Sequence, residues 1–270
     1  MKDFFKLPPK NDFFAYHPEG KYSMLSTAHI VVIVVGIAAI LLACFLLRKT
    51  EHKKIEKILF VFAIIGLIID PLYWIWELIA THKIHFEKSL PLYFCSLYYI
   101  TLAIAVFCKK SGIKQACYAY LATMNLIAGL MGLILNTNLN IWPVLSFAGI
   151  RTLVYHLMMI FVSCLLWFTK YYKPQIKDLY GFFIPIAIMF VPAITVNSIW
   201  GYDYCFLGGG KGTPILQDIS AAMPLFAYIF ILYVVIYIGI VAVFYIPTIV
   251  KYIKSKKSST PPPTTDVSAT

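Results

Sequence analysis

The sequence has very little charge. Only 13% of its 270 residues are Asp, Glu, Lys or Arg, about half of what a soluble globular domain carries. At the same time 60% of the residues are hydrophobic, and the mean hydropathy is +0.79. This balance excludes a soluble globule of this length, because the molecule would lack the charged surface that such a domain presents to water. The chain is therefore expected to be an integral membrane protein.

Paired cysteines are also lacking. No Cys-x-x-Cys motif occurs, so the sequence indicates neither a disulfide framework nor a zinc site. In apolar spans a cysteine usually acts as a small apolar residue. No cofactor and no metal ion are therefore expected. The six scattered cysteines are Cys44, Cys95, Cys108, Cys117, Cys164 and Cys205.

Long apolar runs, by contrast, occupy nearly the whole chain. A helix of about 20 apolar residues crosses the hydrocarbon core and satisfies its own backbone hydrogen bonds. Seven such runs predict an all-α fold, a polytopic bundle of about seven transmembrane helices, at 24–47, 58–80, 90–108, 113–135, 147–168, 179–200 and 221–245. They divide the chain into an interfacial tail (1–23), the helix bundle (24–250) and a basic, Pro- and Thr-rich tail (251–270) that is expected to be disordered.

Basic residues predict the orientation in the membrane. Most Lys and Arg residues lie after the first, third, fifth and seventh runs, for example Arg48, Lys109, Lys170 and Lys256. By the positive-inside rule the C-terminus is cytoplasmic and the N-terminus is outside, in a multi-pass protein of the cell membrane. The net charge of +11 then reflects topology and attraction to anionic lipid, and it requires no nucleic-acid partner.

Ionisable residues inside the apolar runs are candidates for function. Asp70 lies in the middle of the second run, where a charge costs several kcal/mol unless it is paired or faces a polar cavity. Alternatively, Asp70 caps the half-helix that Pro71 restarts. Arg151, in the fifth run, is placed to reach headgroup phosphates or to pair with Asp70, Glu77 or Asp203.

Polar side chains from four runs and their flanks share one half of the bundle under this topology. This clustering predicts one polar cavity that opens toward the outer leaflet. The residues are Glu77, Cys95, Arg151, His156, Asn197 and Asp203.

A thiol and an imidazole at similar depth suggest nucleophilic catalysis. His156 lies too deep in its helix to reach the interface, and a histidine beside a cysteine can take the thiol proton. Asn197, an Asp or a backbone carbonyl would fix the imidazole tautomer. Attack of Cys95 on a lipid ester would give a thioester, which a second lipid or water would accept. Contact between Cys95 and His156 is a hypothesis, and a neutral histidine bonded between helices is the alternative.

Several short motifs carry a resemblance to a known family. The chain resembles the YwaF-type integral membrane proteins, bacterial proteins related to a eukaryotic TMEM protein that acts as a phospholipid acyltransferase. The family pattern reads Pro-Leu-His-x-Cys and Asn-Tyr-x-Phe-Leu, where this chain has Tyr93 and Asp203. The segments and residues that carry the resemblance are Pro91-Leu92-Tyr93-Phe94-Cys95-Ser96-Leu97, His156, Asn197, Asp203-Tyr204-Cys205-Phe206-Leu207, Pro224 and Tyr228.

The resemblance implies acyl transfer between membrane phospholipids, with Cys95 as the nucleophile and His156 and Asn197 as supporting groups. Tyr93 replaces the family histidine, and Tyr is a poor base near neutral pH. Two other classes stay open. One is a transporter or lipid- or small-molecule-binding protein without catalysis, and the other is a structural subunit. The residues expected to contact substrate are Tyr93, Arg151, Asp203, Tyr204, Asp70 and Glu77.

Overall fold

The computed structural model describes residues 24–82, 84, 86–140, 142, 144–175, 178–211 and 213–258. Within them every regular element is a helix, and no strand occurs. The expected N-terminal tail and residues 259–270 of the expected C-terminal tail lie outside the described residues. The elements are α1 (Thr27–Leu47), α2 (His52–Thr81), α3 (Phe86–Ser89), α4 (Leu97–Phe107), α5 (Ser111–Ala122), α6 (Met124–Ile134), η1 (Thr137–Asn140), α7 (Phe147–Phe168), α8 (Leu179–Trp200), η3 (Tyr204–Phe206), α9 (Pro214–Ala221) and α10 (Leu225–Ser258).

Among the residues that the structure describes, six stretches are long and apolar enough to cross a membrane, and α4 is a shorter apolar helix. The six are Thr27–Leu47, His52–Ile79, Ser111–Leu139, Phe147–Phe168, Gly181–Trp200 and Leu225–Ile246. The third expected run differs from the structure, because 90–96 is not helical and α4 begins only at Leu97. Pro91 restricts Leu90 to a non-helical backbone, and side chains of other elements bond the carbonyls of Leu92, Phe94 and Cys95 in place of helix bonds.

The fourth expected run is one span built from two helices. The backbone breaks at Thr123, where φ is −123° and ψ is −83°, and separates α5 from α6. Side chains of α7 accommodate the break. Ser163 donates to the Leu121 carbonyl at 2.7 Å, and Trp167 donates through Nε1 to the Ala122 carbonyl at 2.8 Å. Irregular backbone at membrane depth is tolerated because these protein donors replace the lost helix bonds.

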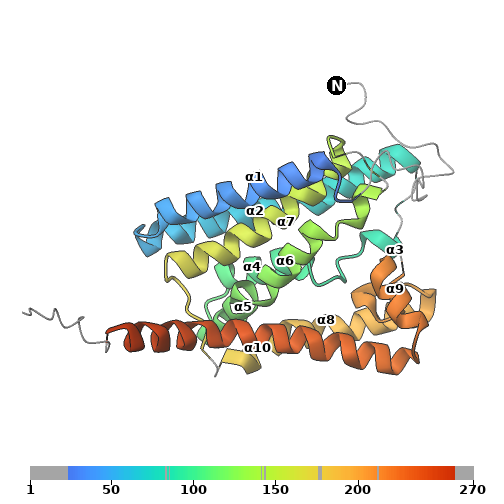
Figure 1. The fold of residues 1–270 in the computed structure, drawn as a ribbon. Helices are drawn as coiled ribbons and strands as arrows, with labels where there is room; N and C mark the ends of the chain where they lie inside the picture. The colour runs from blue at the N-terminus through green and yellow to red at the C-terminus, as the bar shows by residue number, and fades with distance from the viewer. Residues whose placement is uncertain are drawn as a thin grey trace, which may run out of the picture.

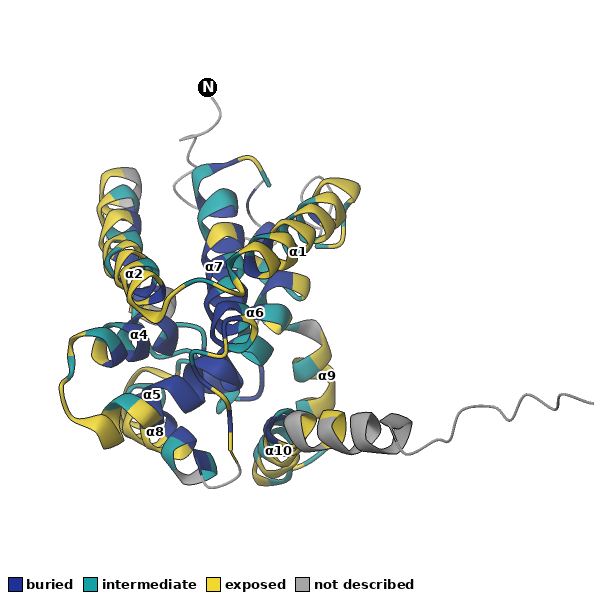
Figure 2. Ribbon diagram, turned by 90° about the vertical axis from the view of Figure 1, so that its left-hand side faces the viewer, coloured by how far each residue is buried: buried dark blue, intermediate teal, exposed yellow. Residues whose placement is uncertain are grey.

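The helices form a bundle in which α7 packs against α1, α2, α5 and α6. In Figure 1, α1, α2 and α7 run alongside one another on one side, α8 and α10 lie on the other, and α4 to α6 lie between. Figure 2 shows the buried residues concentrated on α4, α5 and α7, with exposed faces on α1 and α10. Those exposed faces are apolar, as expected for helices that face lipid.

The connections gather at two opposite ends. One end, called the basic end below, carries the turns 48–51, 108–110 and 169–175, and α2 and α5 begin there. The other end carries α3 and α9, as Figure 1 shows. The expected positive-inside topology assigns the basic end to the cytoplasmic side.

Candidate functional site

Asp70 and Arg151 form an ion pair between α2 and α7. The Arg151 guanidinium donates through Nη2 to the Asp70 carboxylate and lies over the Tyr73 ring, with Cζ 4.1 Å from the ring centroid. The Asp70 side chain is 7% exposed and that of Arg151 is 24% exposed. α2 continues through Pro71 without interruption, so Asp70 does not cap a helix that restarts there. Its carboxylate instead accepts from Arg151 of α7. Of the three partners considered for Arg151, the structure joins it to Asp70.

Cys95 lies in the non-helical segment 90–96. Tyrosines of two neighbouring helices hold this segment through its carbonyl groups. Tyr155 of α7 donates to the Cys95 carbonyl at 3.1 Å, and Tyr120 of α5 donates to the Phe94 carbonyl at 2.6 Å. Arg151 lies four residues before Tyr155 on α7, so the Asp70–Arg151 pair shares a helix face with the contact to the Cys95 carbonyl. The half-buried thiol therefore lies on irregular backbone inside the bundle, beside a buried ion pair.

A loop at 201–213 holds the same segment from the other side. The Cys205 thiol donates to the Leu92 carbonyl at 3.0 Å. The Tyr204 hydroxyl donates to the Phe86 carbonyl and accepts from the Leu90 backbone N–H at 3.2 Å. We call these contacts of Tyr204 and Cys205 the clamp. The clamp fixes the chain that leads to Cys95, from Phe86 at the start of α3 to Leu92.

Asn197 positions the clamp. Its Nδ2 donates to the Tyr204 carbonyl at 3.0 Å, and its Oδ1 accepts from the Tyr204 backbone N–H at 2.9 Å. Cys205 itself has a left-handed backbone with φ of 57°, and its carbonyl accepts from the Tyr233 hydroxyl at 3.0 Å. Because both polar atoms of the Asn197 amide bond Tyr204, Asn197 is linked to the Cys95 segment through the clamp.

Tyr93 and Asp203 occupy the two positions where the chain departs from the family pattern. The Tyr93 ring packs against Tyr204, with the ring centroids 4.9 Å apart. The Asp203 carboxylate accepts from the backbone N–H groups of Gly208 and Lys211 and so folds the loop. Burial raises the pKa of Asp203 above its usual range, although these two donors oppose the shift. Both residues therefore support the clamp in this structure.

His156 is held within α7 and against α6. Its Nδ1 is 2.7 Å from the Thr152 carbonyl, which fits a tautomer in which Nδ1 carries the proton and Nε2 the lone pair. A Cβ atom at Gly132 would lie 2.2 Å from Nε2, so the glycine leaves room for the imidazole. Within the described residues no hydrogen bond joins His156 to Cys95. His156 and Cys95 therefore each have their own hydrogen-bonded surroundings, and the structure shows no direct bond between them.

Glu77 belongs to a separate contact near α3. Its carboxylate accepts from the Ser89 hydroxyl at 2.8 Å, and Trp74 donates through Nε1 to the Ser89 carbonyl at 3.0 Å. These bonds tie α3 to the end of α2. The polar residues expected in one cavity thus form four sets: the ion pair beside Cys95, the clamp with Asn197 and Asp203, the Glu77 contact, and His156.

Several residues of this site were not selected from the sequence. Tyr120 and Tyr155 bond the Cys95 segment, Tyr99 lies beside Asp70, and Thr152 orients His156. A tyrosine in an apolar run looks like an ordinary core residue, so the sequence offers little to distinguish these. A signal was present for Thr152, because it lies four residues before His156 on the same helix face. In the part of the chain that the structure describes, no cluster of three His, Cys, Asp or Glu side chains could hold a metal ion.

These observations define the chain as a multi-pass integral membrane protein built from apolar helices. The model of the TMEM164 family matches residues 24–245, which is most of the chain. The chain therefore belongs to the TMEM164 family. No curated protein and no solved structure matches it. This match confirms the coarser part of the expected resemblance, which is membership of a family of transmembrane proteins.

Proposed function

We propose that this chain is an integral membrane acyltransferase of the YwaF-related type, which acts on phospholipid acyl chains with Cys95 as the nucleophile. The observation that supports this most is the setting of Cys95. The thiol lies on non-helical backbone inside the bundle, beside the Asp70–Arg151 pair and between two sets of positioning contacts. Irregular backbone at membrane depth is retained where it is enclosed by protein or lines a cavity, and such places carry function.

The proposed reaction has two steps. A base takes the Cys95 proton, and the thiolate attacks the acyl carbonyl of a phospholipid ester. The carbon–oxygen ester bond breaks, the acyl group forms a thioester with Cys95, and the departing lysophospholipid oxygen receives the proton. A hydroxyl of a second lipid then gives up its proton and attacks the thioester. The carbon–sulfur bond breaks, a new ester leaves, and the thiolate recovers a proton.

Arg151 is assigned to binding a substrate oxygen. Its Nη2 is engaged with Asp70, whereas its Nε is buried and has no hydrogen-bond partner among the described residues. A buried donor without a partner is costly, and a carbonyl oxyanion or a phosphate oxygen would satisfy it. Asp70 then acts by orienting the guanidinium. Glu77, Tyr93, Asp203 and Tyr204 are assigned to the walls of the substrate site.

His156 and Asn197 take different roles in this proposal. His156 serves as the base, because the Thr152 carbonyl favours the tautomer that leaves Nε2 as the acceptor. Because Nε2 packs against Gly132 of α6, on a different face of α7 from the one that contacts the Cys95 segment, this role requires the imidazole to turn toward the thiol when substrate binds. Asn197 is a positioning residue, since its amide bonds Tyr204, which in turn bonds the segment before Cys95.

The same proposal includes the topology. We infer seven crossings, of which α4 together with the 90–96 segment forms the short one, with the N-terminus outside and the C-terminus in the cytoplasm. The bundle extends over 24–250, between an interfacial N-terminal tail and a basic C-terminal tail. Cys95 then faces the outer half of the cell membrane, where phospholipids arrive by lateral diffusion.

The decisive experiment supplies purified protein with a phospholipid that carries a labelled acyl chain. We expect a hydroxylamine-sensitive label on Cys95 and transfer of the chain to a lysophospholipid. Cys95→Ala should abolish both while the protein still unfolds at its normal temperature. Cys108→Ala, a half-buried cysteine at the other end of α4, is the matched control and should transfer normally. Full transfer by Cys95→Ala would overturn the proposal.

A transporter, or a lipid- or small-molecule-binding protein without catalysis, is the second candidate, and the buried Asp70–Arg151 pair favours it. Ion pairs inside membrane proteins often mark a transport path. This candidate predicts that Asp70→Asn stops movement of lipid or a small solute between leaflets, whereas Cys95→Ala does not. Flux measured across proteoliposomes with these two variants separates the candidates.

A further inference from the structure

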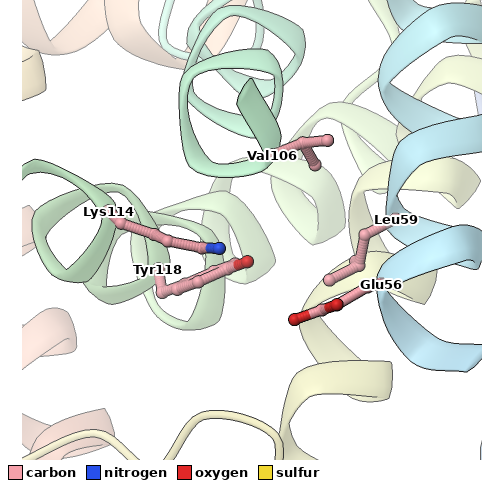
Figure 3. Close-up of a pocket in the computed structure, with 5 residues that line it drawn as sticks. All are labelled: Glu56, Leu59, Val106, Lys114 and Tyr118. Carbon is pink, nitrogen blue, oxygen red and sulfur yellow. The ribbon is translucent and has the colours of Figure 1, made fainter. Parts of the chain in front are cut away.

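A small cavity at the basic end combines two opposite charges. Its volume is about 110 Å³, and it lies between the start of α2, the end of α4 and the start of α5. Figure 3 shows Lys114 and Tyr118 reaching into it from α5, opposite Glu56 and Leu59 of α2. Val106 of α4 closes a third side.

The two charged groups do not neutralise each other directly. Among the described residues Glu56 forms no ion pair with Lys114. The Glu56 carboxylate accepts a hydrogen bond from the Tyr171 hydroxyl through Oε1 at 3.1 Å, and Tyr171 in turn lies 3.3 Å from the Tyr118 hydroxyl. These tyrosines hold the acidic side of the cavity. Oε2 of Glu56 would face a ligand, as would the Lys114 ammonium, which lies 6.0 Å from the centroid of the Tyr118 ring.

This pair of charges discriminates among ligand classes. A simple anion would be attracted by Lys114 but repelled by Glu56. A divalent cation would be attracted by Glu56 but repelled by Lys114. A ligand with both an anionic group and an ammonium satisfies both residues. A primary ammonium fits better than a quaternary one, because only N–H groups can donate to the free carboxylate oxygen of Glu56.

The surroundings indicate that this zwitterion is a lipid headgroup. Phe60 and Phe107, which follow two of the lining residues in the chain, are 44% and 54% exposed, and their ring centroids are 5.6 Å apart. They offer an apolar surface for acyl chains next to the cavity. Lys109 and Lys110, exposed in the turn between α4 and α5, add positive charge where the lipid phosphate would lie.

We propose that the cavity between Glu56 and Lys114 binds a phosphoethanolamine headgroup, with its ammonium at Glu56 and its phosphate at Lys114. This site is separate from the Cys95 site, since 14 residues of α2 between Glu56 and Asp70 correspond to about 21 Å of helix. It does not depend on the proposed acyl transfer. The ligand is a lipid that the protein holds at the level of the basic end without changing it chemically.

Native mass spectrometry of the full chain in detergent tests this with three lipids of identical acyl chains. We expect phosphatidylethanolamine to bind about tenfold more tightly than phosphatidylcholine or phosphatidylglycerol, which corresponds to one charge-assisted hydrogen bond. Glu56→Gln should remove the preference over phosphatidylglycerol, and Lys114→Gln should weaken binding of phosphatidylethanolamine. Glu51→Gln and Lys49→Gln make the same charge changes at the same end, outside the cavity lining, and are the matched controls.

A competition with free phosphoethanolamine distinguishes the source of the ligand. If it displaces phosphatidylethanolamine, the headgroup alone is recognised and a soluble ligand can also occupy the site. If it does not, the membrane lipid is the ligand. Either result supports the proposed chemistry. Equal binding of the three lipids would overturn the proposal, as would equal effects of the cavity variants and their controls, and both results are independent of any acyl transfer by Cys95.

Discussion

Arg151 on α7 donates to the carboxylate of Asp70 on α2, and this ion pair joins two helices next to the segment that carries Cys95. Neither residue can be lost alone without leaving its partner charged in a poorly solvated place. A buried ion pair adds little net stability, but breaking it by removing one partner typically costs about 3 to 5 kcal/mol.

Asp70→Asn should therefore lower the free energy of unfolding by about 3 kcal/mol. The double variant Asp70→Asn with Arg151→Met should recover most of that loss, because no unpaired charge remains. Denaturant unfolding in mixed micelles, analysed as a double-mutant cycle, measures the coupling. Asp218→Asn, on an exposed part of α9, is the control. Additive losses in the cycle would contradict the pairing.

Gly132 and His156 supply a second prediction. Gly132→Ala would bring a methyl group to within 2.2 Å of Nε2, so the imidazole must move. We expect a loss of about 1 to 3 kcal/mol, typical of overpacking, and partial recovery when His156→Ala is added. Gly112→Ala is the matched control, because a methyl group added there would meet nothing within 4 Å. An equal response of the two glycine variants would show that His156 does not occupy this space.

Most of the helices could be predicted from hydropathy, because lipid leaves few alternatives to a helix of about 20 apolar residues. The exceptions lie where protein rather than lipid surrounds the backbone. Pro91 signals that the third run is irregular, but the donors that stabilise 90–96 come from Tyr120 and Tyr155, which are distant in sequence. The break at Thr123 depends similarly on Ser163 and Trp167 of α7.

The sequence predicts how deep each polar side chain of the site lies in the membrane, but not which side chain it contacts. Asp70 and Arg151 were both selected, and one of three proposed pairings is present. Depth alone could not tell which face of α7 His156 occupies. Residues 155 and 156 are adjacent, yet Tyr155 faces the Cys95 segment and His156 faces Gly132, because consecutive residues of a helix point about 100° apart.

Asn197 gives a third prediction, because both of its amide atoms bond the backbone of Tyr204. Asn197→Ala would remove both of these bonds, although the Leu207 backbone N–H still donates to the Tyr204 carbonyl at 3.3 Å, and the loss should cost about 2 kcal/mol. The clamp should then open more often, which would speed maleimide labelling of the buried Cys205 thiol. Thr195→Ala is the control on the same helix, since its exposed hydroxyl bonds only its own helix at the Val191 carbonyl. Unchanged Cys205 labelling in Asn197→Ala would contradict the positioning role.

Asp203 makes the stability depend on pH. Burial raises the pKa of its carboxyl in the folded chain above the value near 4 of an unfolded chain, so the folded state binds its proton more strongly. The contribution of Asp203 to stability is therefore fully present below pH 4 and decreases as the pH rises through the raised pKa. Asp203→Asn removes this titration and should make the unfolding free energy less steeply dependent on pH over that window. Denaturant unfolding of both proteins at a series of pH values from 3.5 upward measures the difference in slope. If Asp203→Asn instead falls more steeply with rising pH than the parent chain, the Gly208 and Lys211 donors outweigh burial and the carboxylate is the favoured form in the loop.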